Sequence, residues 1–128
     1  MIKVYTASKL GHAPRWRALL KEWPEVVFTA RWPHKHVGAV PDEAVFARVF
    51  WEQDLEDVSR AGGVLVYAEP GDHLRGALVE AGMALALGKW VIVVGEHEDY
   101  GTWQYHPLVH RVSDLDQARL LLRTMDLW

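Results

Sequence analysis

The chain has 128 residues, a length suited to one compact domain, so residues 1–128 are interpreted as a single domain. Its 14 basic and 17 acidic side chains are interspersed and give a net charge of −3, which disfavours polymeric nucleic acid and anionic membranes as partners. The lack of cysteine excludes disulfide bonds, thiolate catalysis and cysteine-ligated zinc. Because no apolar stretch is long enough for a membrane span or a signal peptide, we expect a cytoplasmic protein.

Apolar residues recur with periods that predict strands and helices in turn along the chain. The expected elements are a strand at 2–7, a helix at 13–23, a strand at 25–32, a helix at 42–61, a strand at 64–68, a helix at 74–88, strands at 89–95 and 108–112, and a helix at 113–125. This alternation predicts an α/β fold, a single-domain, doubly wound Rossmann-like or flavodoxin-like sandwich with a five-stranded, mostly parallel sheet.

The loops that follow the expected strands are rich in polar and aromatic residues. Two of them, at 33–41 and 96–107, are long for so small a domain, and long loops in compact folds often carry function. In open parallel sheets, ligands bind beyond the carboxyl ends of the strands. The sequence therefore predicts a ligand site on the rim that these loops form.

Glu80 is the only ionisable residue between Arg75 and Lys89, in a helix otherwise built from small and apolar residues. The apolar stripe of this helix is expected to consist of Leu74, Leu78, Ala81 and Leu85. Glu80 would share its face with small residues, which leave room for a ligand above a carboxylate that suits a nucleophile or a base. A solvated glutamate on a short exposed face explains the pattern equally well.

Asp54 raises a similar question in the helix at 42–61, because it follows Phe50 by four residues and so falls inside the apolar stripe. That stripe is expected to consist of Phe46, Val49, Phe50, Val58 and Ala61. An acid in this position is either a general acid whose pKa is raised by its surroundings or a structural group that bonds a backbone amide, a Tyr or an Arg. The residues alone favour the structural role.

The stretch TASKLGH, at 6–12, follows the first strand. Ser8, Lys9 and the backbone near Gly11 offer hydrogen-bond donors where a helix begins, and they could hold an anion, although an ordinary polar loop accounts for the stretch as well. Neither G-x-x-x-x-G-K-[ST] nor G-x-G-x-x-G occurs, which argues against a classical nucleoside triphosphatase or dinucleotide-binding domain.

Histidine and aromatic residues gather in the long loops. His34 and His36 could share a metal, but no third ligand is tied to them by spacing, so we expect no metal and no cofactor. Trp32 and the aromatic residues of the 96–107 loop could stack on a flat ring, or they could pin the loops to the domain or form a subunit contact.

Three stretches carry a family likeness: KVYTAS at 3–8, WEQDLEDVSRAGGVLVYAEP at 51–70 and GALVEAGMALALGKWVIVVG at 76–95. Together they resemble the nucleoside 2-deoxyribosyltransferase-like family, which includes transferases and deoxynucleotide N-glycosidases. The most specific element is Gly-x-x-x-Glu-x-Gly, which begins at Gly76 and is followed by a small-residue helix, Gly-Lys and a buried strand. The resemblance covers most of the chain.

The resemblance implies a role for each of three residues. Glu80 would be the nucleophile, Asp54 would assist proton transfer to the base, and Tyr5 would orient the glutamate. A small nucleoside or nucleotide would be the partner, and Gly76 and Trp32 would contact it. The transferase branch often has an acidic residue before the glycine of this motif, where this chain has Leu-Arg; the nearby Asp72 or His73 could substitute for it.

Two rival functions remain open. One is a nucleotide-binding sensor module without turnover, which the missing acid at Leu74 favours. The other is NAD glycohydrolase chemistry of the TIR type, which also uses one glutamate on an α/β fold.

The seven tryptophans, among them Trp51 and Trp128, offer more aromatic surface than one small core readily hides. We therefore expect a homodimer or a higher homo-oligomer, with some tryptophans between subunits. The resemblance implies the same, because members of the family typically assemble from dimers in which a neighbour completes the pocket. The long loops and the tail TMDLW are the expected contributors.

Overall fold

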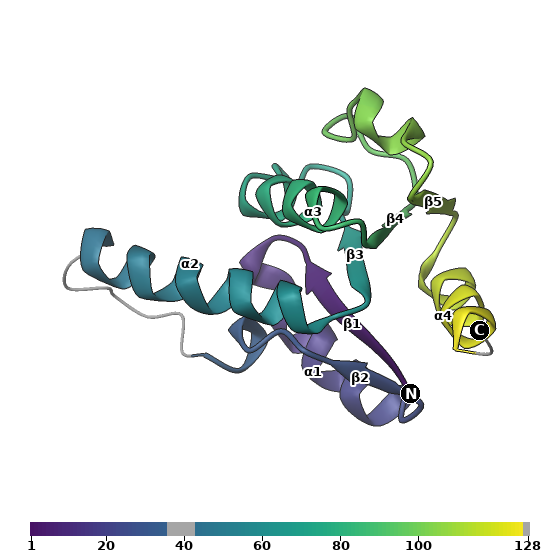
Figure 1. Cartoon of the computed structure of the whole chain (residues 1–128), viewed down its shortest axis with the longest axis horizontal. Coiled ribbons are helices and arrows are strands. Elements are labelled where there is room, and N and C mark those ends of the chain that lie inside the picture. The colour runs from purple at the N-terminus through teal and green to yellow at the C-terminus, as the bar shows by residue number, and fades with distance from the viewer. Residues whose placement is uncertain (36–42, 127–128) are drawn as a thin grey trace.

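The computed structural model describes residues 1–35 and 43–126 (Figure 1). Within these residues, one sheet contains β1 (Ile2–Ala7), β2 (Val26–Phe28), β3 (Gly63–Tyr67), β4 (Trp90–Val94) and β5 (Val109–Val112), in the spatial order β2-β1-β3-β4-β5. The α-helices are α1 (Ala13–Glu22), α2 (Glu43–Arg60), α3 (Gly76–Ala86) and α4 (Leu115–Met125). Short 3₁₀ helices occur at Leu10–His12, Trp32–His34 and Thr102–Tyr105. The predicted α/β sandwich is thus confirmed, with a sheet whose strand pairs are all parallel.

The centre of the sheet is buried on both faces, as its continuously apolar strands predict. Val64, Leu65 and Val66 of β3 have no exposed surface, and β3 pairs along its length with β4, where Val91 lies opposite Val64. Side chains of a strand point alternately to the two faces, so a run without polar residues can fit only where helices cover both.

The helices form a layer on each face. α2 and α3 pack against each other on one face, and α1 and α4 lie on the other, where Arg119 of α4 donates to Glu25, just after α1, at 2.6 Å (Figure 1). Pro14 occupies the first turn of α1, and Asp114 caps α4 by accepting the Gln117 amide at 2.8 Å. Because β1 lies between β2 and β3, the connections after β1 and after β3 leave in opposite directions, which opens a crevice at their carboxyl ends.

The buried face of α3 differs from the predicted stripe. The helix begins at Gly76, and its buried residues are Ala77, Glu80, Ala81 and Ala84. Leu78 and Leu85, which were expected in the core, are only half-buried. The small alanine side chains let α3 approach the sheet closely, so they form its inner face, and Glu80 lies among them.

The predicted stripe of α2 is also partly wrong. Val49 is 42% exposed, whereas the predicted core residues Val58 and Ala61 are buried. Asp57, which has no exposed surface, accepts hydrogen bonds from the backbone and the side chain of Arg31 at 2.9 and 2.8 Å. The predicted first residue of this helix, Asp42, lies outside the described residues, as does the side chain of Phe46.

No helix in the described part of the chain combines the length and the apolar character that a membrane span needs.

Candidate active site

A cavity of about 520 Å³ lies at the carboxyl ends of β1 and β3, in the crevice that the strand order creates. This volume is typical of pockets for small molecules. Its walls are α2, α3, the loops that follow β1 and β3, and the 3₁₀ helix at Trp32–His34. The lining residues are Ser8, Lys9, Leu10, Gly11, Trp32, Ala47, Phe50, Trp51, Asp54, His73, Leu74, Arg75, Gly76, Ala77 and Glu80.

Glu80 reaches the cavity from the second turn of α3 and is only 6% exposed. Its Oε2 accepts a hydrogen bond from the hydroxyl of Tyr5, a fully buried residue of β1. Burial raises the pKa of Glu80 to about 8, because a charged carboxylate loses its hydration there. The hydrogen bond from Tyr5 fixes the orientation of the carboxyl group.

Asp54 enters the same cavity from α2, three turns after the start of the helix. It is half-buried, and burial raises its pKa to about 6, an effect that nearby Asp57 adds to and that the charges of Lys35 and Arg31 oppose. The cavity therefore contains two carboxyl groups from adjacent helices, both of which hold a proton more tightly than usual. Paired acids of this kind are typical of general acid–base sites.

Aromatic rings form the apolar part of the cavity wall. Trp32 is 7% exposed, and its Nε1 donates to the carbonyl oxygen of Thr6 at 2.8 Å, which fixes the ring beside β1. Trp51 packs over Gly76, where a Cβ atom would lie 3.2 Å from the indole ring. Together with Phe50, these rings offer a surface on which a flat heterocycle can stack.

The loop after β1 contributes Ser8, Lys9 and Gly11 to the lining, as predicted. The Ser8 hydroxyl accepts from Trp16 Nε1 at 2.8 Å and donates to the Lys9 carbonyl at 3.2 Å. Lys9 is exposed, and a Cβ at Gly11 would meet no atom within 4 Å, so the loop leaves open space at the cavity mouth.

Asp72 is the predicted binding residue that the structure does not bring into the cavity lining. It accepts the Glu69 amide at 2.8 Å and contacts His12 Nε2 at 2.7 Å. Burial raises its pKa, but the hydrogen bonds from Glu69 and His12 outweigh this and hold the pKa below its ordinary value. Asp72 thus fastens the loop after β3 to the loop after β1, and its neighbour His73 lines the cavity.

Sequence reasoning missed Phe50 and Trp51 as cavity residues. Phe50 was interpreted as a core residue, and Trp51 was named only among the seven tryptophans, some of which were expected between subunits. Both lie within one turn of Asp54 on α2, so their side chains gather on the side of the helix that bears the acid. That spacing is the signal that could have identified them.

The other histidine and aromatic residues that the sequence singled out in the long loops, where the structure describes them, are not part of the cavity lining. His34 ends the 3₁₀ helix at Trp32–His34 and is exposed, whereas His36 lies outside the described residues. Tyr100 is buried and donates to the Val94 carbonyl at 2.9 Å, so it pins the loop after β4 to the domain. Tyr105 is 66% exposed.

The fold is shared with solved bacterial proteins. A 2-deoxyribosyltransferase from Bacillus psychrosaccharolyticus has 16% identity to this chain, covering 91% of it and 90% of the other chain, with a TM-score of 0.69. A conserved protein from Enterococcus faecalis V583 has 16% identity, with coverages of 98% and 99% and a TM-score of 0.64. The CMP N-glycosidase BcmB of Clostridium botulinum has 17% identity, with coverages of 97% and 98% and a TM-score of 0.56. No protein-family profile and no curated protein matches the sequence.

Proposed function

We propose that this protein is a nucleoside 2-deoxyribosyltransferase-like enzyme that cleaves or transfers the N-glycosidic bond of a 2′-deoxynucleoside or its 5′-monophosphate. The observation that carries the proposal is the buried Glu80 carboxyl group, which accepts a hydrogen bond from Tyr5 at the wall of a cavity that Asp54 also lines. The fold shared with a 2-deoxyribosyltransferase and a CMP N-glycosidase supports this class of reaction.

In the first step, an ionised oxygen of Glu80 bonds to C1′ of the sugar while the bond from C1′ to the base nitrogen breaks. Asp54 gives its proton to the departing base, which leaves as a neutral molecule. In the second step, the Asp54 carboxylate takes a proton from water or from a second base. The oxygen or nitrogen of that acceptor bonds to C1′, and the ester bond to Glu80 breaks. Hydrolysis and transfer therefore differ only in the acceptor.

The walls of the cavity fit the two ends of such a substrate. Trp32, Phe50 and Trp51 offer stacking surfaces for the base. Lys9 and Gly11 line the cavity, and the open space at Gly11 beside the lysine cation suits a 5′-phosphate. A substrate that spans both regions would present C1′ between the two acids.

The test is to incubate the purified protein with the four deoxynucleosides, their 5′-monophosphates, CMP and NAD, and to separate the products by chromatography. We expect free base from one or more deoxy substrates and none with Glu80→Gln. Release of nicotinamide from NAD alone would replace the proposal with glycohydrolase chemistry of the TIR type. Release of nothing from any substrate would contradict the enzymatic assignment.

A second candidate function is ligand binding without turnover. Leu74 lines the cavity, and Leu74 and Arg75 stand where the transferase branch often has an acidic residue, so one polar contact is lost there. Calorimetry on the same panel distinguishes the two functions, because a sensor would bind one of the nucleotides with no release of base.

A further inference from the structure

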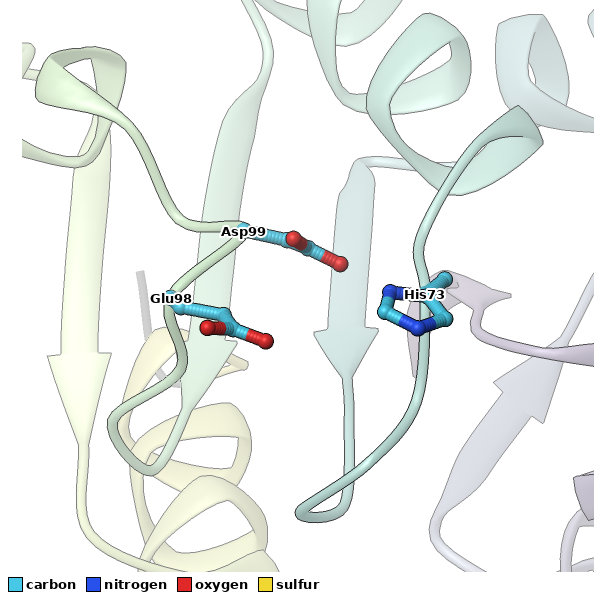
Figure 2. Close-up of side chains that lie close together, drawn as sticks. All are labelled: His73, Glu98 and Asp99. Atoms are coloured by element: carbon cyan, nitrogen blue, oxygen red, sulfur yellow. The ribbon is translucent and has the colours of Figure 1, made fainter.

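A second cluster of polar side chains lies at the carboxyl edge of the sheet, beside the cavity. His73 comes from the loop between β3 and α3, and Glu98 and Asp99 come from the loop after β4. Figure 2 shows the three side chains pointing toward one another across the gap between these loops. Their nearest nitrogen and oxygen atoms all lie within 4.8 Å of one another.

Hydrogen bonds from backbone amides to side chains support this arrangement, one between the two loops and one within the loop after β4. The amide of Leu74, next to His73, donates to Asp99 Oδ2 at 2.8 Å. The Asp99 amide donates to His97 Nδ1 at 3.0 Å, which shapes the loop that carries both acids. A carboxylate oxygen has more than one lone pair, and Asp99 Oδ1 is a further acceptor, so Asp99 keeps the capacity to bind a cation.

Among the described residues, no Lys or Arg side chain pairs with either carboxylate of the cluster. In the described part of the chain, neither His73 nor Glu98 makes an ion pair. His97 Nδ1 lies 3.8 Å from Asp99 Oδ2 and accepts the hydrogen bond of the Asp99 amide, so it lies beside the cluster and outside it. Two carboxylates this close repel each other, and a bound cation would remove that repulsion.

The spacing also suits an ion. Ligand atoms at about 2.1 Å from one metal lie roughly 3 to 4 Å from each other, so small rotations of exposed side chains would bring this cluster to coordination distances. His73 and Glu98 are exposed and Asp99 is half-buried, which leaves the side chains free to make that adjustment.

We propose that His73, Glu98 and Asp99 form a binding site for one divalent transition-metal ion of the Zn²⁺ or Mn²⁺ type. Imidazole nitrogen is a poor ligand for Mg²⁺ and Ca²⁺, whereas a mixed set of one imidazole and two carboxylates suits Zn²⁺ and Mn²⁺. Three protein ligands leave at least one coordination position for water or for a group of a bound molecule. Because His73 also lines the cavity, the ion would lie at the cavity mouth and tie the two loops together.

Calorimetry on the chelator-treated full chain, with Zn²⁺, Mn²⁺ and Mg²⁺ as separate titrants and no nucleotide present, tests the site. We expect one Zn²⁺ per chain, weaker or absent binding of Mg²⁺, and a rise in melting temperature with Zn²⁺. His73→Ala and Glu98→Gln should each weaken Zn²⁺ binding by at least about tenfold, as the loss of a ligand does.

Two matched controls separate this site from other histidines and acids. The double variant His34→Ala, His36→Ala removes the histidine pair of the 33–41 loop, and Glu96→Gln removes a neighbouring acid; both should bind Zn²⁺ as the unchanged chain does. Loss of binding in the double variant with binding retained in His73→Ala would overturn the assignment, as would an unchanged chain that takes up no stoichiometric Zn²⁺. Because no substrate is present, these outcomes do not depend on the proposed glycosidic reaction.

Discussion

As the proposed nucleophile, Glu80 would have to satisfy two opposed demands. A nucleophile has to be ionised, yet burial raises the pKa of this carboxyl group from 4.5 to about 8. The folded state therefore favours the protonated form, and this contribution to stability is complete below the pKa of the unfolded chain and is lost as the pH rises toward 8. The residue costs the protein stability under the conditions in which it would react.

The variant Glu80→Gln tests both the cost in stability and the proposed role in catalysis. The amide does not titrate, so the free energy of unfolding of the variant should equal that of the unchanged chain near pH 4 and exceed it by roughly 4 to 5 kcal/mol near pH 8.5. Catalysis should fall by at least ~10³-fold at every pH. Denaturant unfolding at the two pH values and initial rates measure the two effects. A variant that keeps most of its activity would remove Glu80 from the nucleophilic role.

The two raised pKa values predict an unusual pH profile. Glu80 must lose a proton, with a pKa of about 8, while Asp54 must keep one, with a pKa of about 6. The product of the two fractions gives kcat/KM that rises below pH 6, is flat near pH 7 and falls above pH 8.

The variant Asp54→Asn shows which part of the pH profile depends on Asp54. Without the acid, the falling limb should vanish and the rise should extend to about pH 8, where Glu80 ionises. The loss in rate should be larger for poor leaving bases than for activated ones, because protonation matters least when the base leaves easily. A profile that keeps both limbs in Asp54→Asn, or equal losses across leaving groups, would contradict the acid role.

At the scale of the elements, α3 defines one wall of the cavity through Gly76. A Cβ atom at this position would lie 3.2 Å from the Trp51 ring, so Gly76→Ala should displace the indole and raise KM severalfold with a smaller change in kcat. Gly82→Ala on the same helix is the matched control, since a Cβ there meets no atom within 4 Å. This control should gain about 0.5 to 1 kcal/mol of stability and keep its KM. Equal KM values in the two variants would exclude Gly76 from the wall.

The loop after β1 carries the prediction about phosphate. If Lys9 and the backbone near Gly11 bind a 5′-phosphate, Lys9→Ala should raise KM for the monophosphate by about tenfold and leave KM for the free nucleoside unchanged. Lys21→Ala, on α1, is a control that removes one exposed positive charge elsewhere. If both substrates respond equally to Lys9→Ala, the loop does not contact the phosphate.

The sequence predicts the positions of the strands better than the start of α3. The strands β3 and β4 were predictable because a short, continuously apolar run fits only a sheet buried on both faces. The start of α3 at Gly76 was not predictable, because Leu74 fits the helical spacing of apolar residues and so extends the predicted helix by two residues. The Leu74 amide instead donates to Asp99, and Arg75 has non-helical dihedral angles of −132° and −76°. Such a contact across two loops leaves no periodic signal.

The candidate site shows the same division. Glu80 and Asp54 were recognisable as acids among apolar residues, and the structure brings them into one cavity. The spacing of apolar residues could not show that alanines form the inner face of α3. A predicted apolar stripe gives most weight to large side chains, and it does not consider that small side chains let a helix lie close to the sheet. The cluster of His73, Glu98 and Asp99 joins two loops that only the strand order makes neighbours.

At the scale of the whole molecule, we propose that the chain forms a homodimer. The described tryptophans give less support than expected: Trp16, Trp23 and Trp32 are buried within the chain, and Trp51, Trp90 and Trp103 are half-buried. Exposed apolar side chains on α2, on α3 and at Leu87, which directly follows α3, give more support. Val45, Val79 and Leu87 are 58%, 55% and 51% exposed, respectively, and exposed apolar surface often marks an interface.

Light scattering across a dilution series tests the assembly. We expect a mass near twice 14.6 kDa, falling to that of one chain in Val79→Asp. Leu120→Asp, at a similarly exposed position on α4, should remain a dimer. An unchanged chain that is monomeric at micromolar concentration, with activity intact, would refute both the dimer and a site shared between subunits.

The positions of the tryptophan rings allow intrinsic fluorescence to report ligand binding. Trp32 and Trp51 line the cavity, whereas Trp16 and Trp23 are buried in the core and are not part of its lining. A base stacked on the first two should quench part of the intrinsic fluorescence and leave the emission of the core rings unchanged. Stopped-flow fluorescence of the unlabelled chain can therefore measure the rate of substrate binding before the glycosidic bond breaks. The variant Trp51→Phe would show how much of the fluorescence change comes from the Trp51 ring, which packs over Gly76.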